Sequence, residues 1–153
     1  MKLVTIFLLF LGITCYYQGI DVSTWQGNID WPTTAQNTYF AVIRAGYGIG
    51  HIDNYFETNY QKAKANGVKV GAYWYSYASS VNDAVQEANS IINALAGKQF
   101  EWPIYYDIEE QSIFDAGIAS DIARAFCNVL EANKYYCGIY SSTNAFDTYF
   151  DDD

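Results

Sequence analysis

The chain has 153 residues, which is enough for one domain with a substantial core. It carries 8 Lys and Arg against 17 Asp and Glu, a formal net charge of −9 that argues against nucleic acid as a partner. No basic run or basic helix face favours binding to a membrane surface. Aromatic residues make up 18% of the chain, which suits stacking against sugar rings as well as packing.

The sequence predicts neither a metal site nor a cofactor. No group of His and Cys residues has the spacing of metal ligands. His51 stands alone, and we interpret it as a solvated loop residue rather than a ligand or a base.

The N-terminus has the pattern of a secretory signal peptide. Lys2 provides a positive start, and residues 3–13 form an apolar stretch that is too short to span a bilayer. We interpret residues 1–18 as the signal peptide, cleaved between Cys15 and Gly19, and residues 19–153 as the mature domain. The protein would then be secreted, or delivered to the lumen of a digestive vacuole, without a membrane anchor. A lipoprotein acylated on Cys15 is the alternative, which Thr14 disfavours.

Cys127 and Cys137 remain in the mature chain, in a compartment that permits a disulfide. The helix expected around residues 118–132 has an apolar stripe, and Cys127 lies on the flank of that stripe. This position argues against a bond between the two cysteines, but the sequence leaves the question open.

Strands and helices alternate along the mature chain. Strands are expected at residues 19–23, 39–45, 68–77, 102–110 and 136–140, and helices at residues 53–67, 82–97, 118–132 and 144–150. This order predicts the α/β class, with a parallel sheet that curls into a (β/α) barrel. The nearly continuous apolar run of residues 39–45 predicts a strand covered on both faces.

Residues 102–110 organise the rest of the chain. Side chains alternate along a strand, so Tyr105, Asp107 and Glu109 share one face. Asp107 and Glu109 are separated by about 6.6 Å along the strand, and two such carboxyl groups backed by aromatic rings do not both ionise at their ordinary pKa. One proton donor beside one carboxylate is what cleavage of a glycosidic bond requires. The alternative is a strand end that meets solvent, where acids are common.

Further polar residues lie at or near the carboxyl ends of other strands, where (β/α) barrels carry their active sites. These residues are Asp21, Arg44, Tyr75 and Tyr140. Their convergence with Asp107 and Glu109 favours a functional site.

The sequence resembles the family 25 glycoside hydrolases, the cellosyl-type lysozymes or N-acetylmuramidases. Residues 19–31 (GIDVSTWQGNIDW) are similar to the opening motif of that family. Residues 40–48 (FAVIRAGYG), 71–75 (GAYWY), 103–109 (PIYYDIE) and 138–142 (GIYSS) match its later motifs in order. The resemblance covers essentially the whole mature chain.

The resemblance implies an irregular TIM-like barrel of five β/α units followed by three further strands. It implies hydrolysis of the β-1,4 bond between N-acetylmuramic acid and N-acetylglucosamine in peptidoglycan. Glu109 would be the general acid. Asp107 would stabilise the charged intermediate, directly or by orienting the acetamido group of the substrate. Asp21 would tune this pair and help to place the sugar.

The resemblance also suggests residues that would bind the substrate. Tyr73, Tyr75 and Tyr140 are candidate walls of a glycan groove, or else they fill the barrel. Arg44 pairs with a carboxylate of the site or satisfies a buried one. Two neighbouring acids are given other roles: Asp53 is expected to cap a helix, and Glu110 to face away from Glu109.

In one respect the sequence departs from the family pattern. The five β/α units are complete by residue 153, while the last three strands and a further acidic residue of the family are absent. We therefore expect a truncated product, or a chain whose open edge something else covers; a complete protein would be a monomer. The alternatives are a fragment that at most binds glycan, and a hydrolase acting on another acetylated glycan such as chitin. Digestive, defensive and lytic roles stay open.

Overall fold

The computed structural model describes residues 17–151. The expected signal peptide lies almost entirely outside the described residues, and Cys15 with it, so its cleavage stays a prediction. Within residues 17–151, none of the helices has the length and apolar character needed to cross a membrane.

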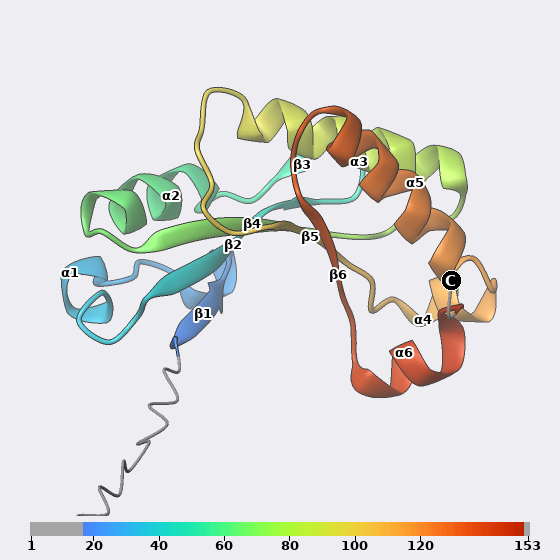
Figure 1. Cartoon of the computed structure of the whole chain (residues 1–153), viewed down its shortest axis with the longest axis horizontal. Helices are drawn as coiled ribbons and strands as arrows, with labels where there is room; N and C mark the ends of the chain where they lie inside the picture. Colours follow the sequence, from blue (N-terminus) through green and yellow to red (C-terminus); the bar gives the residue numbers. More distant parts are fainter. Residues whose placement is uncertain (1–16, 152–153) are drawn as a thin grey trace, which may run out of the picture.

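A parallel sheet forms the centre of the molecule (Figure 1). Its strands are β1 (Gly19–Val22), β2 (Phe40–Tyr47), β4 (Lys69–Tyr75), β5 (Ile104–Asp107) and β6 (Cys137–Tyr140), hydrogen-bonded in the order β1-β2-β4-β5-β6. A short strand, β3 (His51–Ile52), pairs antiparallel with the end of β2. The predicted α/β class and the parallel sheet are confirmed. In the part of the chain that the structure describes, the order ends at β1 and β6, so closure into a barrel stays a prediction.

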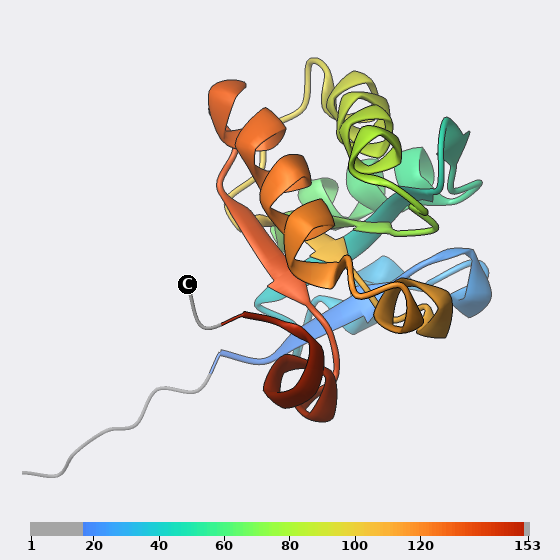
Figure 2. The same ribbon diagram turned by 90° about the vertical axis from the view of Figure 1, so that its right-hand side faces the viewer.

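Helices follow most of the strands. They are η1 (Thr24–Gln26), α1 (Trp31–Thr34), α2 (Phe56–Ala65), α3 (Val81–Leu95), α4 (Gln111–Asp115), α5 (Ala119–Ala132) and α6 (Thr143–Tyr149). Figures 1 and 2 show that α2, α3 and α5 lie together on one side of the sheet. Gly67 and Gly97, which the sequence predicts as the stops of α2 and α3, both have a φ of +75°, which glycine adopts readily.

The core lies between the sheet and these three helices. In β5, Ile104 and Tyr106 are buried on the helix side, and the Tyr106 ring stacks on Phe126 of α5 with their centroids 3.8 Å apart. In β2, Ile43 is fully buried, whereas Val42 is only half-buried. The expectation that residues 39–45 are covered on both faces is therefore wrong, because helices pack on only one face of this strand. The other face remains free for a site.

Cys127 and Cys137 form a disulfide, which the sequence left open and the position of Cys127 on the flank of the helix stripe argued against. Their Cα atoms lie 5.3 Å apart, because β6 runs back along the flank of α5 that carries Cys127. The bond ties an edge strand of the sheet to the helix layer.

The double substitution Cys127→Ala with Cys137→Ala should lower the free energy of unfolding by about 2–3 kcal/mol, since the disulfide closes a short loop in the unfolded chain. The cysteines are 10 residues apart. Urea denaturation of both proteins, with and without reductant, measures the difference. Reductant should destabilise only the wild type. Equal stability of the two proteins in the absence of reductant would contradict the stabilising role of the disulfide.

Candidate functional site

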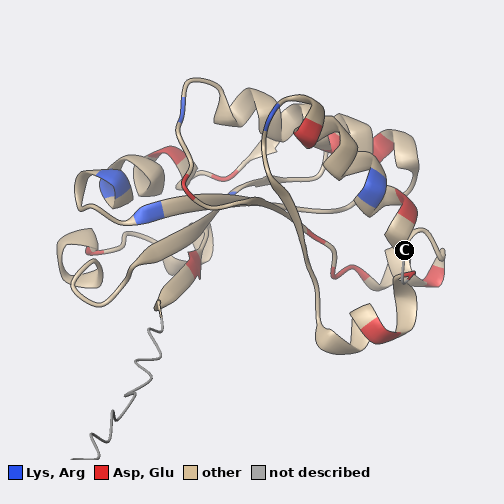
Figure 3. Cartoon of the chain, viewed as in Figure 1, with Lys and Arg blue, Asp and Glu red and all other residues tan. Residues whose placement is uncertain are grey.

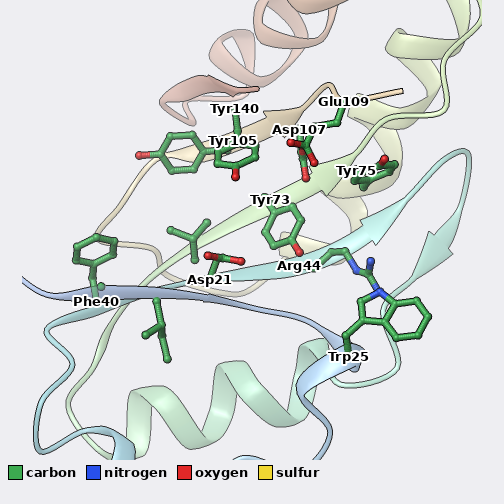
Figure 4. A pocket seen from close by; sticks show the side chains of 13 residues that line it. Asp21, Trp25, Phe40, Arg44, Tyr73, Tyr75, Tyr105, Asp107, Glu109 and Tyr140 are labelled. Carbon is green, nitrogen blue, oxygen red and sulfur yellow. The ribbon is translucent and has the colours of Figure 1, made fainter. Parts of the chain in front are cut away.

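A cavity of about 560 Å³ opens on the face of the sheet opposite α2, α3 and α5. Every residue that the sequence singled out for the site lines it: Asp21, Arg44, Tyr73, Tyr75, Asp107, Glu109 and Tyr140. Figure 4 shows these side chains converging from five strands and the loop after β5. Strand alternation produces this result, because the opposite face of each strand is occupied by the apolar core.

The Asp107 and Glu109 side chains lie side by side in this cavity (Figure 4). Asp107 is only 6% exposed, whereas Glu109, two residues further on, is exposed. Burial raises the pKa of Asp107 to about 7, and the negative charges of Glu109 and Asp21 add to the rise. One carboxyl group of the pair thus keeps its proton close to neutral pH, as the spacing predicts.

Asp107 also has an unsatisfied acceptor. Its Oδ1 atom is buried and has no hydrogen-bond partner among the described residues. Buried polar atoms are normally paired, so such an atom in a cavity wall is suited to a group that donates a hydrogen bond.

Asp21 reaches the same cavity from β1, on the other side of Tyr73 (Figure 4). The third acid therefore faces the pair rather than the far side of the sheet. The Tyr73 ring lies between Asp21 and the pair of Asp107 and Glu109 (Figure 4). Burial raises the pKa of Tyr73 to about 12. Tyr73 therefore keeps its hydroxyl proton over the range in which the acids titrate.

Arg44 satisfies a buried carboxylate, which is the second of the two roles left open for it. Its guanidinium binds Asp53 Oδ2, with both Nε and one terminal nitrogen at 2.8 Å. Asp53 also accepts the backbone N–H groups of Thr24 at 3.0 Å and Tyr55 at 2.8 Å. The expectation that Asp53 caps the helix is wrong, because the N-cap of α2 is Tyr55 and has no side-chain cap bond. Asp53 instead joins the loop after β1, strand β2 and the turn before α2. The positive charge of Arg44 still lowers the pKa of Asp107.

Tyr75 and Tyr140 form walls of the cavity. The Tyr75 hydroxyl donates a hydrogen bond of 2.8 Å to Glu110 Oε1, and burial together with this bond raises its pKa. Glu110 does not line the cavity, which agrees with the expectation that it faces away from Glu109. Tyr140 is 55% exposed, and the negative charge of Glu109 raises its pKa.

Sequence reasoning missed Trp25, which lines the cavity and is 82% exposed. A capping box holds its short helix η1: the Ser23 hydroxyl accepts the N–H of Trp25, and Gln26 Oε1 accepts the N–H of Ser23. The Ser-x-x-Gln pattern of residues 23–26 signals this turn in the sequence. Tyr105 and Phe40 complete the aromatic lining.

Residues 17–151 contain no group of three or more His, Cys, Asp and Glu side chains that could hold a metal ion. His51 lies in β3 rather than in a loop and stacks on Tyr47, with ring centroids 5.2 Å apart. The ionisable side chains that line the main cavity are carboxyl groups, tyrosines and one paired arginine.

A parallel sheet that presents paired carboxyl groups in an aromatic cavity defines an α/β protein with the features of a glycoside hydrolase. Residues 20–153 match the model of glycosyl hydrolases family 25, and the chain belongs to this family.

Two protein relatives and one solved structure illustrate the match. The uncharacterised protein YegX of Escherichia coli K12 is 36% identical over 104 residues, which cover 64% of this chain and 38% of YegX. The autolytic lysozyme of Clostridium acetobutylicum is 27% identical over 128 residues, 83% of this chain and 39% of the relative. A family 25 glycosyl hydrolase from Bacillus anthracis superposes with a TM-score of 0.74 at 24% identity, covering 90% of this chain and 66% of that one. The chain thus spans less than half the length of the two protein relatives.

Replacing Asp107 with Asn should change how stability depends on pH. The folded protein holds the Asp107 proton up to a pKa of about 7, against an ordinary value of 3.8. Between these values the folded state binds more protons than the unfolded state, so the free energy of unfolding falls as pH rises. Asn does not ionise, so the free energy of unfolding of Asp107→Asn lacks this fall. Between pH 4 and pH 8, the free energy of unfolding of Asp107→Asn should therefore rise by roughly 2–4 kcal/mol relative to that of the wild type.

Thermal and urea unfolding at several pH values measure this gain. The matched control is Asp121→Asn on α5, whose carboxyl group is exposed and lines no described cavity. A stability difference between Asp107→Asn and wild type that stays constant from pH 4 to pH 8 would contradict the raised pKa.

Proposed function

We propose that this protein is a lysozyme that hydrolyses the β-1,4 bond between N-acetylmuramic acid and N-acetylglucosamine in peptidoglycan. The observation that carries the proposal is the pair Asp107 and Glu109 in an aromatic cavity that Asp21 also faces. Membership of glycosyl hydrolases family 25 and the likeness to an autolytic lysozyme support it.

In this proposal the exposed Glu109 is the general acid that protonates the leaving glycosidic oxygen. Asp107 lies deeper and faces the sugar carbon at which positive charge develops. The pair holds one proton, and the developing positive charge lowers the pKa of Asp107, so that this proton passes to the neighbouring Glu109 and from there to the leaving oxygen, leaving Asp107 ionised. Its unpaired Oδ1 suits the N–H of the substrate acetamido group. Asp21 raises the pKa of Asp107 and Arg44 lowers it, so these two residues adjust the charge of the pair in opposite directions.

The aromatic walls supply the binding surface. Tyr73, Tyr75, Tyr140 and the exposed Trp25 present ring faces to a glycan strand, and stacking on such faces needs no charge on the ligand. The net charge of −9 gives no attraction to an anionic cell wall. Recognition in this proposal rests on stacking and hydrogen bonds.

We also propose a domain organisation and a place of action for the protein. Residues 1–18 are a secretory signal peptide, and residues 19–153 are the catalytic domain. The protein acts outside the cell or in the lumen of a digestive vacuole without a cofactor, and a complete protein would be a monomer.

Glu109→Gln should lower the rate of reducing-end release from purified peptidoglycan by about 100-fold or more, because glutamine cannot donate the proton. Glu131→Gln is the matched control, since Glu131 is exposed on α5 and lines no described cavity. Mass spectrometry of the products identifies which sugar carries the new reducing end. Equal release by wild type and Glu109→Gln would refute the assignment, and wall binding without hydrolysis by wild type would identify a glycan-binding fragment.

Trp25→Ala should raise KM for soluble glycan strands by about 2- to 10-fold, which corresponds to about 0.5–1.5 kcal/mol for one aromatic stacking contact, while kcat changes little. Tyr136→Ala removes an equally exposed aromatic side chain that does not line the main cavity. Initial rates over a range of glycan concentrations separate the two constants. A fall in kcat without a change in KM would show that Trp25 does not act as a binding surface.

A further inference from the structure

A second cavity, of about 300 Å³, lies beside the carboxyl ends of β2 and β4. The proposed function makes no use of it. Its lining consists of three rings, two acids, Gly48 and Ile49. The rings are those of Tyr47, His51 and Tyr77, and the acids are Asp83 and Glu87.

The three rings contact one another beside Gly48. Tyr47 stacks face to face on His51, with centroids 5.2 Å apart, and meets Tyr77 edge-on at 6.1 Å. A Cβ atom added at Gly48 would lie 3.5 Å from Tyr77 and 3.7 Å from His51, so the backbone at Gly48 lies close to both side chains. Tyr77 is 57% exposed although it is a large aromatic residue, so much of its ring surface is available to a ligand.

The charge in this cavity is negative. Hydrogen bonds from the hydroxyl and the N–H of Ser79 lower the pKa of Asp83, which therefore carries its charge at neutral pH. Glu87 is fully buried, and its oxygens accept the N–H of Tyr77 at 2.9 Å and the hydroxyl of Tyr106 at 2.6 Å. Glu87 thus holds the backbone of Tyr77 in place, and Asp83 is the acid that a ligand can reach.

No Lys or Arg lines this cavity among the residues that the structure describes. The nearby Arg44 guanidinium, 5.5 Å from the centre of the Tyr47 ring, is bound to Asp53. Aromatic faces beside an uncompensated carboxylate attract organic cations. A neutral sugar would gain no charge–charge attraction from this carboxylate.

The second cavity adjoins the main one. Tyr75 lines the main cavity and Tyr77 lines the second, and their ring centroids are 5.2 Å apart. A polymer held in the main cavity can therefore place a side branch in the second without leaving the protein surface.

We propose that the second cavity binds a primary ammonium group on an alkyl chain, carried by a peptide branch of the glycan in the main cavity. The ammonium lies against the exposed ring of Tyr77 and pairs with Asp83. The source of the amine rests on the proposed function, whereas the binding of the amine does not.

The direct test is an NMR titration of the ¹⁵N-labelled protein with Nα-acetyl-lysine methylamide. We expect saturable shifts of the Gly48 and Tyr77 amides with a dissociation constant in the millimolar range. The same compound acetylated on its side-chain amine should bind at least about fivefold more weakly, because it has lost its charge. Equal affinity for both compounds, absence of saturation, or shifts confined to the main cavity would overturn the proposal.

Variants locate the site. Tyr77→Ala and Asp83→Asn should each weaken binding of the amine about three- to tenfold, whereas Tyr77→Phe, which keeps the ring, should retain it. Tyr136→Ala and Asp121→Asn are matched controls that line neither cavity. Unchanged affinity in both Tyr77→Ala and Asp83→Asn, with folding verified by the amide spectrum, would overturn the assignment.

A second assay distinguishes the two proposals. Tyr77→Ala should raise KM severalfold for glycan strands that carry amine-bearing peptides and leave KM unchanged for peptide-free strands. If wild type cleaves neither polymer, the proposed hydrolysis fails and the NMR titration still decides the amine site. An equal change of KM for both polymers would refute the placement of the branch.

Discussion

The packing of α2, α3 and α5 on only one face of the parallel sheet is the constraint on which the rest of the structure depends. Alternation then assigns every strand side chain either to this core or to the opposite face. Ile104 and Tyr106 of β5 go into the core, while Tyr105 and Asp107 go to the cavity. The chemistry of the candidate site is thus a consequence of which residues the helices leave uncovered.

The core side also supports the site from behind. The Ser76 hydroxyl donates to the Tyr106 hydroxyl at 2.8 Å, and Tyr106 donates to Glu87 of α3 at 2.6 Å. The N–H of Ser76 binds the carbonyl of Asp107 at 2.9 Å. These bonds join α3, β5 and the end of β4, so the backbone that carries Asp107 and the segment that carries Tyr77 are held by one buried network. Figure 3 shows acidic residues in β1 and in the loop after β5, the two segments that contribute Asp21 and Glu109 to the main cavity.

What the sequence predicted wrongly, left open or missed has one origin. The apolar run in β2 resembled a strand covered on both faces, but composition does not report which neighbours arrive. Cys127 was judged by its place on a helix stripe, whereas the return of β6 along that flank decides its bond to Cys137. Arg44 finds Asp53 because β3 brings that residue back beside β2. Trp25 was passed over because it lies in a turn rather than in a strand or a long helix.

Local order in the sequence was enough to determine the α/β class, the alternation of strands and helices, and the set of side chains that share the face of Asp107 and Glu109. These properties depend on periodicity and on residues close together in the chain, which one sequence displays directly. Only the tertiary structure decided that Asp107 is the buried acid, that Arg44 pairs with Asp53, and that a second cavity adjoins the first. Burial, ion pairing and cavity walls depend on the relative positions of segments far apart in the chain, and no local pattern encodes these distances.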